Sequence, residues 1–355
     1  MEKRSKTIVI SDVHMSNGQN YSWFHDTNSK KLAGMLNSIA KDPTVRELVL
    51  LGDLFDLWLY PVDEIPWTVD EIVADNPSIT AALRRCVEEI PDVYYMNGNH
   101  DMSVQPHQLN AFSAGGKSIQ WIGTQDYKKK HNGWHLEHGH LADMFNAPCD
   151  PDDAIAGLPL GYFITRLVAT AADQGVVWNK LREFFETIRD FLEVAERPEM
   201  VAAEAAVPEA FVLRPGTYLV RGIIRVLEEL AEVDDSTVFR FAEPALDDKK
   251  YTVGDVKEKY GNLYDTWHEK YPGLKLLNAI LATSGLDWYA NDILTEDPEL
   301  KVIVMGHTHE STKDNEYGND GCWCMYGVFG HAHTDPTYVE IDGENTKVVT
   351  WRQEG

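Results

Sequence analysis

The first 140 residues alternate short apolar runs with amphipathic stretches, and this alternation is the feature that most constrains the fold. Segments 6–14, 45–56 and 92–101 each contain a continuous apolar run, which is typical of a buried strand. Between them, 29–42 and 79–90 carry apolar residues at helical spacing. Strands that alternate with helices in this way predict an α/β domain.

The rest of the chain divides into a helical part and a part rich in strands. Apolar residues at helical spacing predict three further helices, at 159–173, 179–196 and 221–233. Strand patterns occur at 133–140, 301–310, 322–329, 336–342 and 346–352. Because strands resume after the helical stretch, we predict one α/β core made of residues 1–142 and 300–355. Residues 143–299 would then be a helical insertion.

Charge and cysteine content exclude several classes of protein. The formal net charge of −25 over 355 residues makes long nucleic acid an improbable partner, since phosphate neutralisation requires clustered Lys and Arg. The N-terminal region contains no apolar segment long enough for a signal peptide or a membrane span, so we expect a soluble cytoplasmic protein. The four cysteines show no C-x-x-C pairing, which argues against a disulfide framework or a zinc knuckle. Cys322 and Cys324 are expected on one face of a strand.

The predicted strands of the core end on residues that can bind metals. These residues are Asp12 and His14, Asp53 and Asp56, Asn99, His100 and Asp101, His138 and His140, and finally His307 and His309. In open α/β sheets the carboxyl ends of the strands line the ligand crevice, so we expect these side chains to converge on one place. The sequence therefore predicts a metal site at this edge.

The order of these motifs, D-x-H, G-D-x-x-D, G-N-H-D, a later histidine and G-H-x-H, resembles the calcineurin-like metallophosphoesterase superfamily. The resemblance covers residues 7–140 and 300–340. It implies a four-layer α/β/β/α sandwich, here with a helical insertion or cap domain, and a metal-dependent phosphoesterase activity. It also implies two divalent metal ions at the ends of the sheets.

The same resemblance assigns a role to each motif residue. The implied ligands of one ion are Asp12, His14 and His309. The implied ligands of the other ion are Asn99, His138 and His307. Asp53 resembles the carboxylate that bridges the two ions. His100 is implied to stand beside the phosphate, where it protonates the leaving oxygen, and Asp56 to fix its tautomer.

Chemistry supports this division of roles. A shared carboxylate holds two cations about 3.5–4 Å apart, where they lower the pKa of a bridging water and promote attack of the resulting hydroxide on phosphorus. Mixed carboxylate, imidazole and amide ligands suit Mn best, with Fe or Zn as alternatives, and suit Mg or Ca less well.

Other histidines compete for these roles. His331 and His333 in GHAH imitate GHTH, but two glycines in GVFGHAH suggest a turn, whereas His307 and His309 follow a continuous apolar run. His140 stands where relatives often carry Asp in H-G-D, so it is expected either to contact a metal ligand or to touch the substrate.

The substrate is less constrained than the reaction. GDLFDLW lacks the Arg-Gly that continues this motif in protein serine/threonine phosphatases, and it is similar to the pyrophosphatases that cleave UDP-2,3-diacylglucosamine. Those enzymes typically have Arg where His100 stands and a shorter cap. We expect a small or lipid-linked nucleotide-type phosphodiester or pyrophosphate, with the cap selecting it. The alternatives are a DNA-processing nuclease of the same superfamily, or a scaffold that keeps the fold without catalysis.

Overall fold

The computed structural model describes residues 4–150, 157–176, 180, 183, 215–271, 274–282, 285–314, 316–324 and 336–352. The chain divides into two compact units. The α/β unit contains Met1–Leu57, Trp67–His140 and Thr283–Gly355. The helical unit contains Trp58–Pro66 and Leu141–Ala282. Each unit is described separately below.

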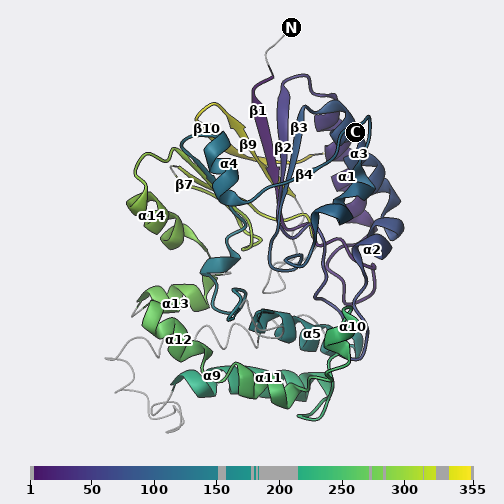
Figure 1. Cartoon of the computed structure of the whole chain (residues 1–355), viewed down its shortest axis with the longest axis vertical. Coiled ribbons are helices and arrows are strands. Elements are labelled where there is room, and N and C mark those ends of the chain that lie inside the picture. The colour runs from purple at the N-terminus through teal and green to yellow at the C-terminus, as the bar shows by residue number, and fades with distance from the viewer. Residues whose placement is uncertain are drawn as a thin grey trace. The chain divides into compact units, whose positions relative to one another are not determined.

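The larger sheet of the α/β unit has six strands in the order β10-β9-β1-β2-β3-β4 (Figure 1). Its four parallel strands are β1 (Lys6–Ile10), β2 (Val45–Leu51), β3 (Asp92–Met96) and β4 (Gln120–Trp121). Its two antiparallel strands are β9 (Thr337–Asp342) and β10 (Asn345–Thr350). The strands predicted in these segments are confirmed, and β4 was not predicted.

The smaller sheet has four strands in the order β5-β6-β8-β7. Its three parallel strands are β5 (Trp134–Leu136), β6 (Val302–Met305) and β8 (Tyr317–Asp320). β7 (Ser311–Asp314) pairs with β8 in an unpredicted antiparallel hairpin. The strand predicted at 322–329 is wrong over Cys322–Cys324, where the chain bends, because Gly321 ends β8 with a φ of 75°.

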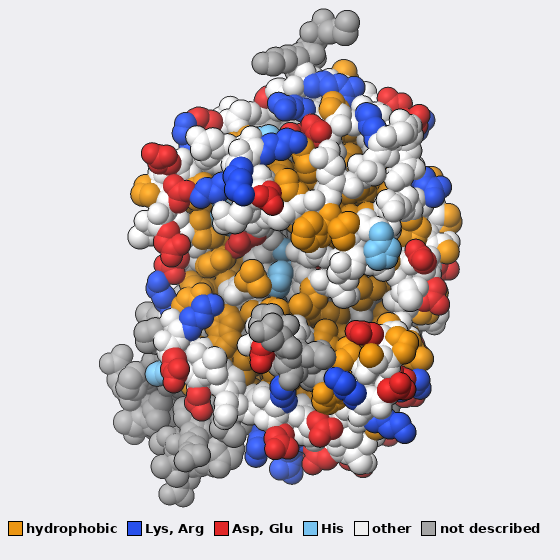
Figure 2. Space-filling model, in the orientation of Figure 1, with side chains coloured by type: hydrophobic (Ala, Val, Ile, Leu, Met, Phe, Trp, Pro, Cys, Tyr) orange, Lys and Arg blue, Asp and Glu red, His pale blue; other side chains and the backbone are white. Residues whose placement is uncertain are grey.

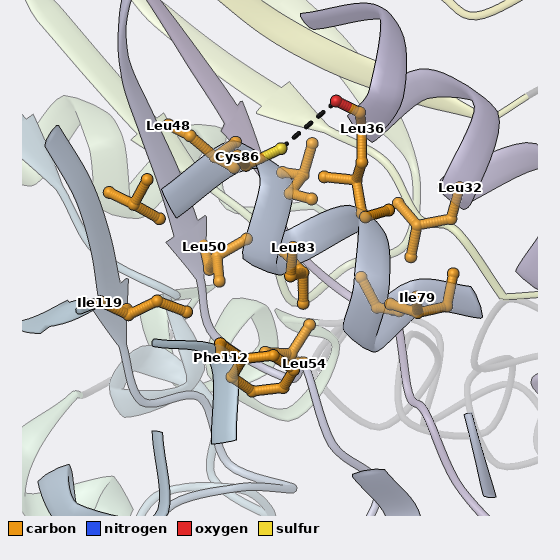
Figure 3. Close-up of a cluster of buried hydrophobic side chains, with 14 of the residues drawn as sticks. Leu32, Leu36, Leu48, Leu50, Leu54, Ile79, Leu83, Cys86, Phe112 and Ile119 are labelled. Atoms are coloured by element: carbon orange, nitrogen blue, oxygen red, sulfur yellow. Dashed lines mark hydrogen bonds between the residues drawn. The ribbon is translucent and has the colours of Figure 1, made fainter. Parts of the chain in front are cut away.

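Two apolar cores use opposite faces of the larger sheet, because successive strand residues point to opposite sides. Ile8 and Ile10 belong to a core with helices α1 (Asp26–Lys41) and α3 (Pro77–Glu89), part of which is drawn in Figure 3. Val9 belongs to a second core that includes side chains from both sheets. The α/β unit therefore stacks helices, the larger sheet and the smaller sheet. The complete four-layer sandwich stays a prediction.

The remaining helices belong to one unit or the other. Those of the α/β unit are α2 (Val69–Asp75), the 3₁₀ helix Pro106–Phe112, α4 (Thr124–Lys130) and α14 (Asp287–Glu296). Those of the helical unit are α5 (Leu160–Asp173), α9 (Pro215–Ala231), α10 (Pro244–Asp247), α11 (Val253–Lys259), α12 (Leu263–Lys270) and α13 (Leu274–Ile280). A short 3₁₀ turn, His140–Ala142, lies at the boundary.

The apolar stripes predicted for the helical unit are used for packing within it. α5 packs against α9, and the two confirm the helices predicted at 159–173 and 221–233. The helix predicted at 179–196 falls almost entirely outside the described residues. Among the described helices, none combines the length and the apolar character that crossing a membrane requires.

Arg166 of α5 organises the helical unit from a fully buried position. Its Nε donates to the carbonyl oxygen of Tyr60 (2.6 Å), and its Nη2 donates to those of Pro61 (2.6 Å) and Glu64 (2.7 Å). Its Nη1 donates to the carbonyl oxygen of Arg240 (2.6 Å). The planar guanidinium thus joins the segment Trp58–Pro66 to α5 and to the chain around Arg240.

We expect Arg166→Lys to lower the free energy of unfolding by about 3 kcal/mol or more. A single ammonium group cannot reach all the carbonyl oxygens to which the guanidinium donates, so some buried carbonyls would be left without a hydrogen bond. Urea denaturation followed by circular dichroism measures the change. The control is Arg225→Lys on α9, since the Arg225 side chain is 78% exposed and forms an ion pair with the exposed Glu229. If the two variants unfolded at the same urea concentration, the proposed role of Arg166 would be wrong.

Candidate metal centre

The predicted site residues follow the carboxyl ends of five strands. Asp12 comes after β1, Asp53 after β2 and Asn99 after β3, while His138 comes after β5 and His307 after β6. The described contacts join the nine residues with a predicted ligand or catalytic role into one buried cluster within the α/β unit. These side chains therefore lie close together, as the sequence predicts.

The backbone at this cluster adopts unusual conformations. Five of the predicted ligands have left-handed backbone angles: Asp12 (φ 52°), His14 (φ 56°), Asp53 (φ 53°), His307 (φ 72°) and His309 (φ 60°). Such angles cost about 1–3 kcal/mol each in a residue other than glycine, and they concentrate at functional sites. The surrounding fold holds the side chains in place against this cost.

Glycines allow the loops to approach one another closely. A Cβ atom at Gly98 would lie 2.6 Å from the backbone nitrogen of Asp53, and one at Gly306 would lie 2.6 Å from Cβ of Ser11. Both distances are too short for any side chain. The glycines of G-N-H-D and G-H-T-H are therefore required by the approach of the neighbouring metal-binding loop.

The first predicted ligand set forms a compact group of donors. His309 Nε2 lies 3.3 Å from Asp12 Oδ1 and 3.0 Å from His14 Nε2. Asp12 Oδ2 accepts hydrogen bonds from Ser11 Oγ–H and from the backbone N–H of His307 (2.9 Å). Asp12 Oδ1 is buried without a hydrogen-bond donor among the described residues. A buried carboxylate oxygen beside two imidazole nitrogens fits a divalent cation.

The second predicted ligand set converges on an amide oxygen. Asn99 Oδ1 lies 3.1 Å from His138 Nε2 and 3.1 Å from His307 Nδ1. Asp53 lies between the two sets, with its Oδ2 3.2 Å from His138 Nε2 and 3.8 Å from His14 Nε2. The other Asp53 oxygen, Oδ1, accepts a hydrogen bond from the backbone N–H of His100 (2.8 Å).

Asp56 contacts two histidines. Its Oδ1 lies 2.9 Å from His100 Nδ1, and its Oδ2 lies 3.4 Å from His14 Nδ1. The hydrogen bond to His100 holds the ring with Nδ1 as the donor and directs Nε2 away from the carboxylate. Charge attraction from both histidines lowers the pKa of Asp56 below its usual range, although burial alone would raise it.

The electrostatics of the cluster pair carboxylates with imidazoles. Burial alone would raise the pKa of Asp12, but His138 and His309 lower it to about 2. Burial alone would lower the pKa of His138, but Asp53 and Asp12 raise it to about 10. In the metal-free protein His138 is therefore protonated at neutral pH, and ions would displace protons when they bind.

Two aspartates support the cluster without a role assigned from the sequence. Asp101 Oδ1 accepts from the N–H of Gly98 (2.7 Å) and its Oδ2 accepts from the N–H of Leu54 (2.8 Å), which ties the loops after β2 and β3 together. Burial, and then repulsion by Asp53, raise the pKa of Asp101 to about 6. Asp320 Oδ2 accepts from the N–H of Ser11 (2.5 Å), next to Asp12, and its Oδ1 lies 2.8 Å from Ser11 Oγ.

Two further residues were missed as members of the site. The ring of Trp23 packs beside His14 (centroids 5.2 Å apart), His100 (5.7 Å) and His309 (5.8 Å). Cys324 Sγ lies 3.6 Å from His309 Nδ1. Nothing in the sequence indicates Trp23. Cys324 could have been found by its place after a sixth strand, since β8 runs parallel to β6 and ends at Asp320.

The other histidines considered as ligands differ in whether and where the structure places them. His331 and His333 lie outside the described residues. The half-buried His140 has its ring 5.5 Å from that of His138 and 6.5 Å from that of His307, between centroids. His140 therefore borders the centre and touches two of its imidazoles.

Comparison with known proteins agrees with these motifs. No curated protein matches the chain. Residues 5–165 match the family model described as calcineurin-like phosphoesterase, and this range contains every predicted site residue except His307 and His309. The match supports the calcineurin-like metallophosphoesterase superfamily and indicates metal-dependent phosphoester hydrolysis by this chain.

Proposed function

We propose that the protein uses two divalent ions to hydrolyse a phosphodiester or pyrophosphate bond in a small or lipid-linked nucleotide-type substrate. The observation that carries this proposal is the position of Asp53. Its Oδ2 lies 3.2 Å from His138 Nε2 and 3.8 Å from His14 Nε2, so one carboxylate reaches nitrogens of both predicted ligand sets. A bridging carboxylate is what a two-ion site requires.

The donors on either side of Asp53 suit two ions of borderline character. One would be held by Asp12, His14 and His309. The other would be held by Asn99, His138 and His307. Imidazole, carboxylate and amide donors favour Mn, with Fe or Zn as alternatives. When bound, such ions supply Lewis acidity and activate water at neutral pH.

His100 is our proposed general acid. Asp56 Oδ1 lies 2.9 Å from Nδ1 of its ring, so the carboxylate occupies the Nδ1 side and Nε2 is left as the atom from which a proton would be transferred. The backbone N–H of His100 also donates to Asp53, so the loop after β3 carries the acid and also fixes the bridging carboxylate of the loop after β2. A proton given to the leaving oxygen lowers the cost of breaking the ester bond.

The proposed substrate class rests on charge and on the helical residues. On the face drawn in Figure 2, basic and acidic side chains are interspersed, and the whole chain carries a formal net charge of −25. Such a surface disfavours long nucleic acid, which needs a continuous basic path. We further propose that residues 143–299 select the substrate, because two-ion chemistry acts on phosphorus and discriminates little between leaving groups.

Hydrolysis of bis-p-nitrophenyl phosphate and p-nitrophenyl phosphate tests the activity. We expect Mn-dependent turnover that a chelator abolishes and added Mn restores, with the diester preferred. Linear and supercoiled DNA test the nuclease alternative in the same buffer. If protein containing two bound ions turned over neither ester, the non-catalytic scaffold would replace the proposed function.

Asp53→Asn should remove both ions and the activity together, because an amide cannot bridge two cations. We expect metal affinity to fall by more than about 100-fold, a larger loss than is typical for an outer-shell change. Metal content after gel filtration measures the effect. The control is Asp126→Asn, since Asp126 is exposed and forms an ion pair with Lys129 on the same helix. Two retained ions in Asp53→Asn would rule out the bridging assignment.

His100→Ala should keep both ions and lose a factor of about 10² to 10⁴ in kcat, the usual contribution of a general acid. The loss should be smaller for a substrate with a good leaving group, such as p-nitrophenolate, than for an alkyl ester. His107→Ala provides the control, because His107 is exposed on a nearby 3₁₀ helix. A metal-free His100→Ala protein would show that His100 belongs to the ligand set.

A further inference from the structure

Two of the predicted histidine ligands use one ring nitrogen for an outer partner and direct the other toward the cluster. His138 places Nδ1 2.9 Å from the carbonyl oxygen of Leu51 and Nε2 3.2 Å from Asp53 Oδ2. His14 places Nδ1 3.4 Å from Asp56 Oδ2 and Nε2 3.8 Å from Asp53 Oδ2. An outer partner on Nδ1 fixes the tautomer, orients the ring and makes Nε2 a better donor to a metal.

His309 follows the same pattern with a different partner. Its Nε2 lies 3.3 Å from Asp12 Oδ1 and 3.0 Å from His14 Nε2, within the first predicted ligand set. Its Nδ1 lies 3.6 Å from Cys324 Sγ, a separation suited to a hydrogen bond to the larger sulfur atom. Cys324 thus has the position that a backbone carbonyl has for His138 and that a carboxylate has for His14.

The loop that carries Cys324 is fixed to the centre by neighbouring contacts. The backbone N–H of Trp323 donates to the carbonyl oxygen of Asp12 (3.0 Å), and the carbonyl oxygen of Trp323 accepts from Asn28 Nδ2 (3.0 Å). Cys322 Sγ–H donates to the carbonyl oxygen of Cys324 (3.7 Å). Trp323 and Cys324 are each 1% exposed. The sulfur is therefore held in place by the same loop contacts that reach Asp12.

We propose that Cys324 is a positioning residue: its sulfur accepts a hydrogen bond from His309 Nδ1–H and so fixes Nε2 of His309 toward the ion shared with Asp12 and His14. This proposal rests on the proposed two-ion function. It assigns to this chain a sulfur contact at one ion only, which makes the two ion sites chemically unequal.

Direct ligation by the sulfur is the competing arrangement, since His14, His309 and Cys324 place one ligand atom each within 4.8 Å of the others. The geometry favours positioning. The sulfur lies on the Nδ1 side of His309, whereas Asp12 Oδ1 and His14 Nε2 lie on the Nε2 side. Because the two nitrogens of an imidazole point in divergent directions, an ion held by Sγ and Nδ1 would lose the donors on the opposite side of the ring.

Titration of metal-free, full-length protein with Mn²⁺ by calorimetry tests the proposal. We expect the unaltered protein to bind two ions. Cys324→Ala should bind one of them about 10- to 100-fold more weakly, the usual effect of removing an outer partner, while the other ion keeps its affinity. Cys324→Ser should lose less, because its hydroxyl can still accept from Nδ1–H. Cobalt-loaded protein should show no sulfur-to-metal charge-transfer absorption.

Cys86→Ala is the matched control, since Cys86 is also fully buried but donates to the carbonyl oxygen of Leu36 in the core drawn in Figure 3. It should keep both affinities. Unchanged affinities in Cys324→Ala, or a sulfur charge-transfer band that disappears in Cys324→Ser, would overturn the positioning role alone. If Cys324→Ala does not fold, Cys324→Val, whose side chain is apolar and offers no acceptor, takes its place, and unchanged affinities in that variant overturn the positioning role. An unaltered protein that binds no ion would overturn the two-ion function as well.

Discussion

The carboxylate of Asp53 is the contact on which the centre depends. One oxygen accepts the N–H of His100, and the other approaches His138 and His14, so a single side chain joins loops that follow four strands in two sheets. The nearby backbone permits this only because position 98 is glycine. An aspartate is also short enough to be held rigidly, which a shared ligand between two ions requires.

The strained backbone around Asp53 has to be stabilised by the rest of the α/β unit. Left-handed angles at ligands such as Asp12 and His309 cost free energy that their local sequence does not return. Buried aspartates compensate: Asp101 accepts two backbone N–H groups from the adjoining loops, and Asp320 accepts the backbone N–H of Ser11. These bonds fix the loops, and the apolar cores on both faces of the larger sheet fix the strands from which the loops emerge.

Most of the α/β unit could be predicted from the sequence, because buried parallel strands appear as continuous apolar runs and their carboxyl ends carry the motif residues. Other features depend on tertiary context. The hairpin β7–β8 was missed because STKD and YGND carry no apolar run, and Cys322–Cys324 was assigned to a strand although Gly321 had already ended β8. Because these residues were predicted to lie within a strand, Cys324 was not recognised as a residue that follows the end of one. Trp23 reaches the histidines only through folding, so no local pattern indicates it.

The pairing of carboxylates with protonated histidines changes how the centre acquires its ions. With the pKa of Asp12 lowered from 3.8 to about 2 and that of His138 raised from 6.5 to about 10, attraction between the two contributes stability that is lost as pH falls from 3.8 toward 2 or rises from 6.5 toward 10. Attraction between carboxylates and imidazoles therefore holds the cluster together without a cation. Folding can precede metallation, unlike in small zinc domains that collapse without their ion. Loading of the proposed ions would then be an exchange of protons for cations in an already folded scaffold.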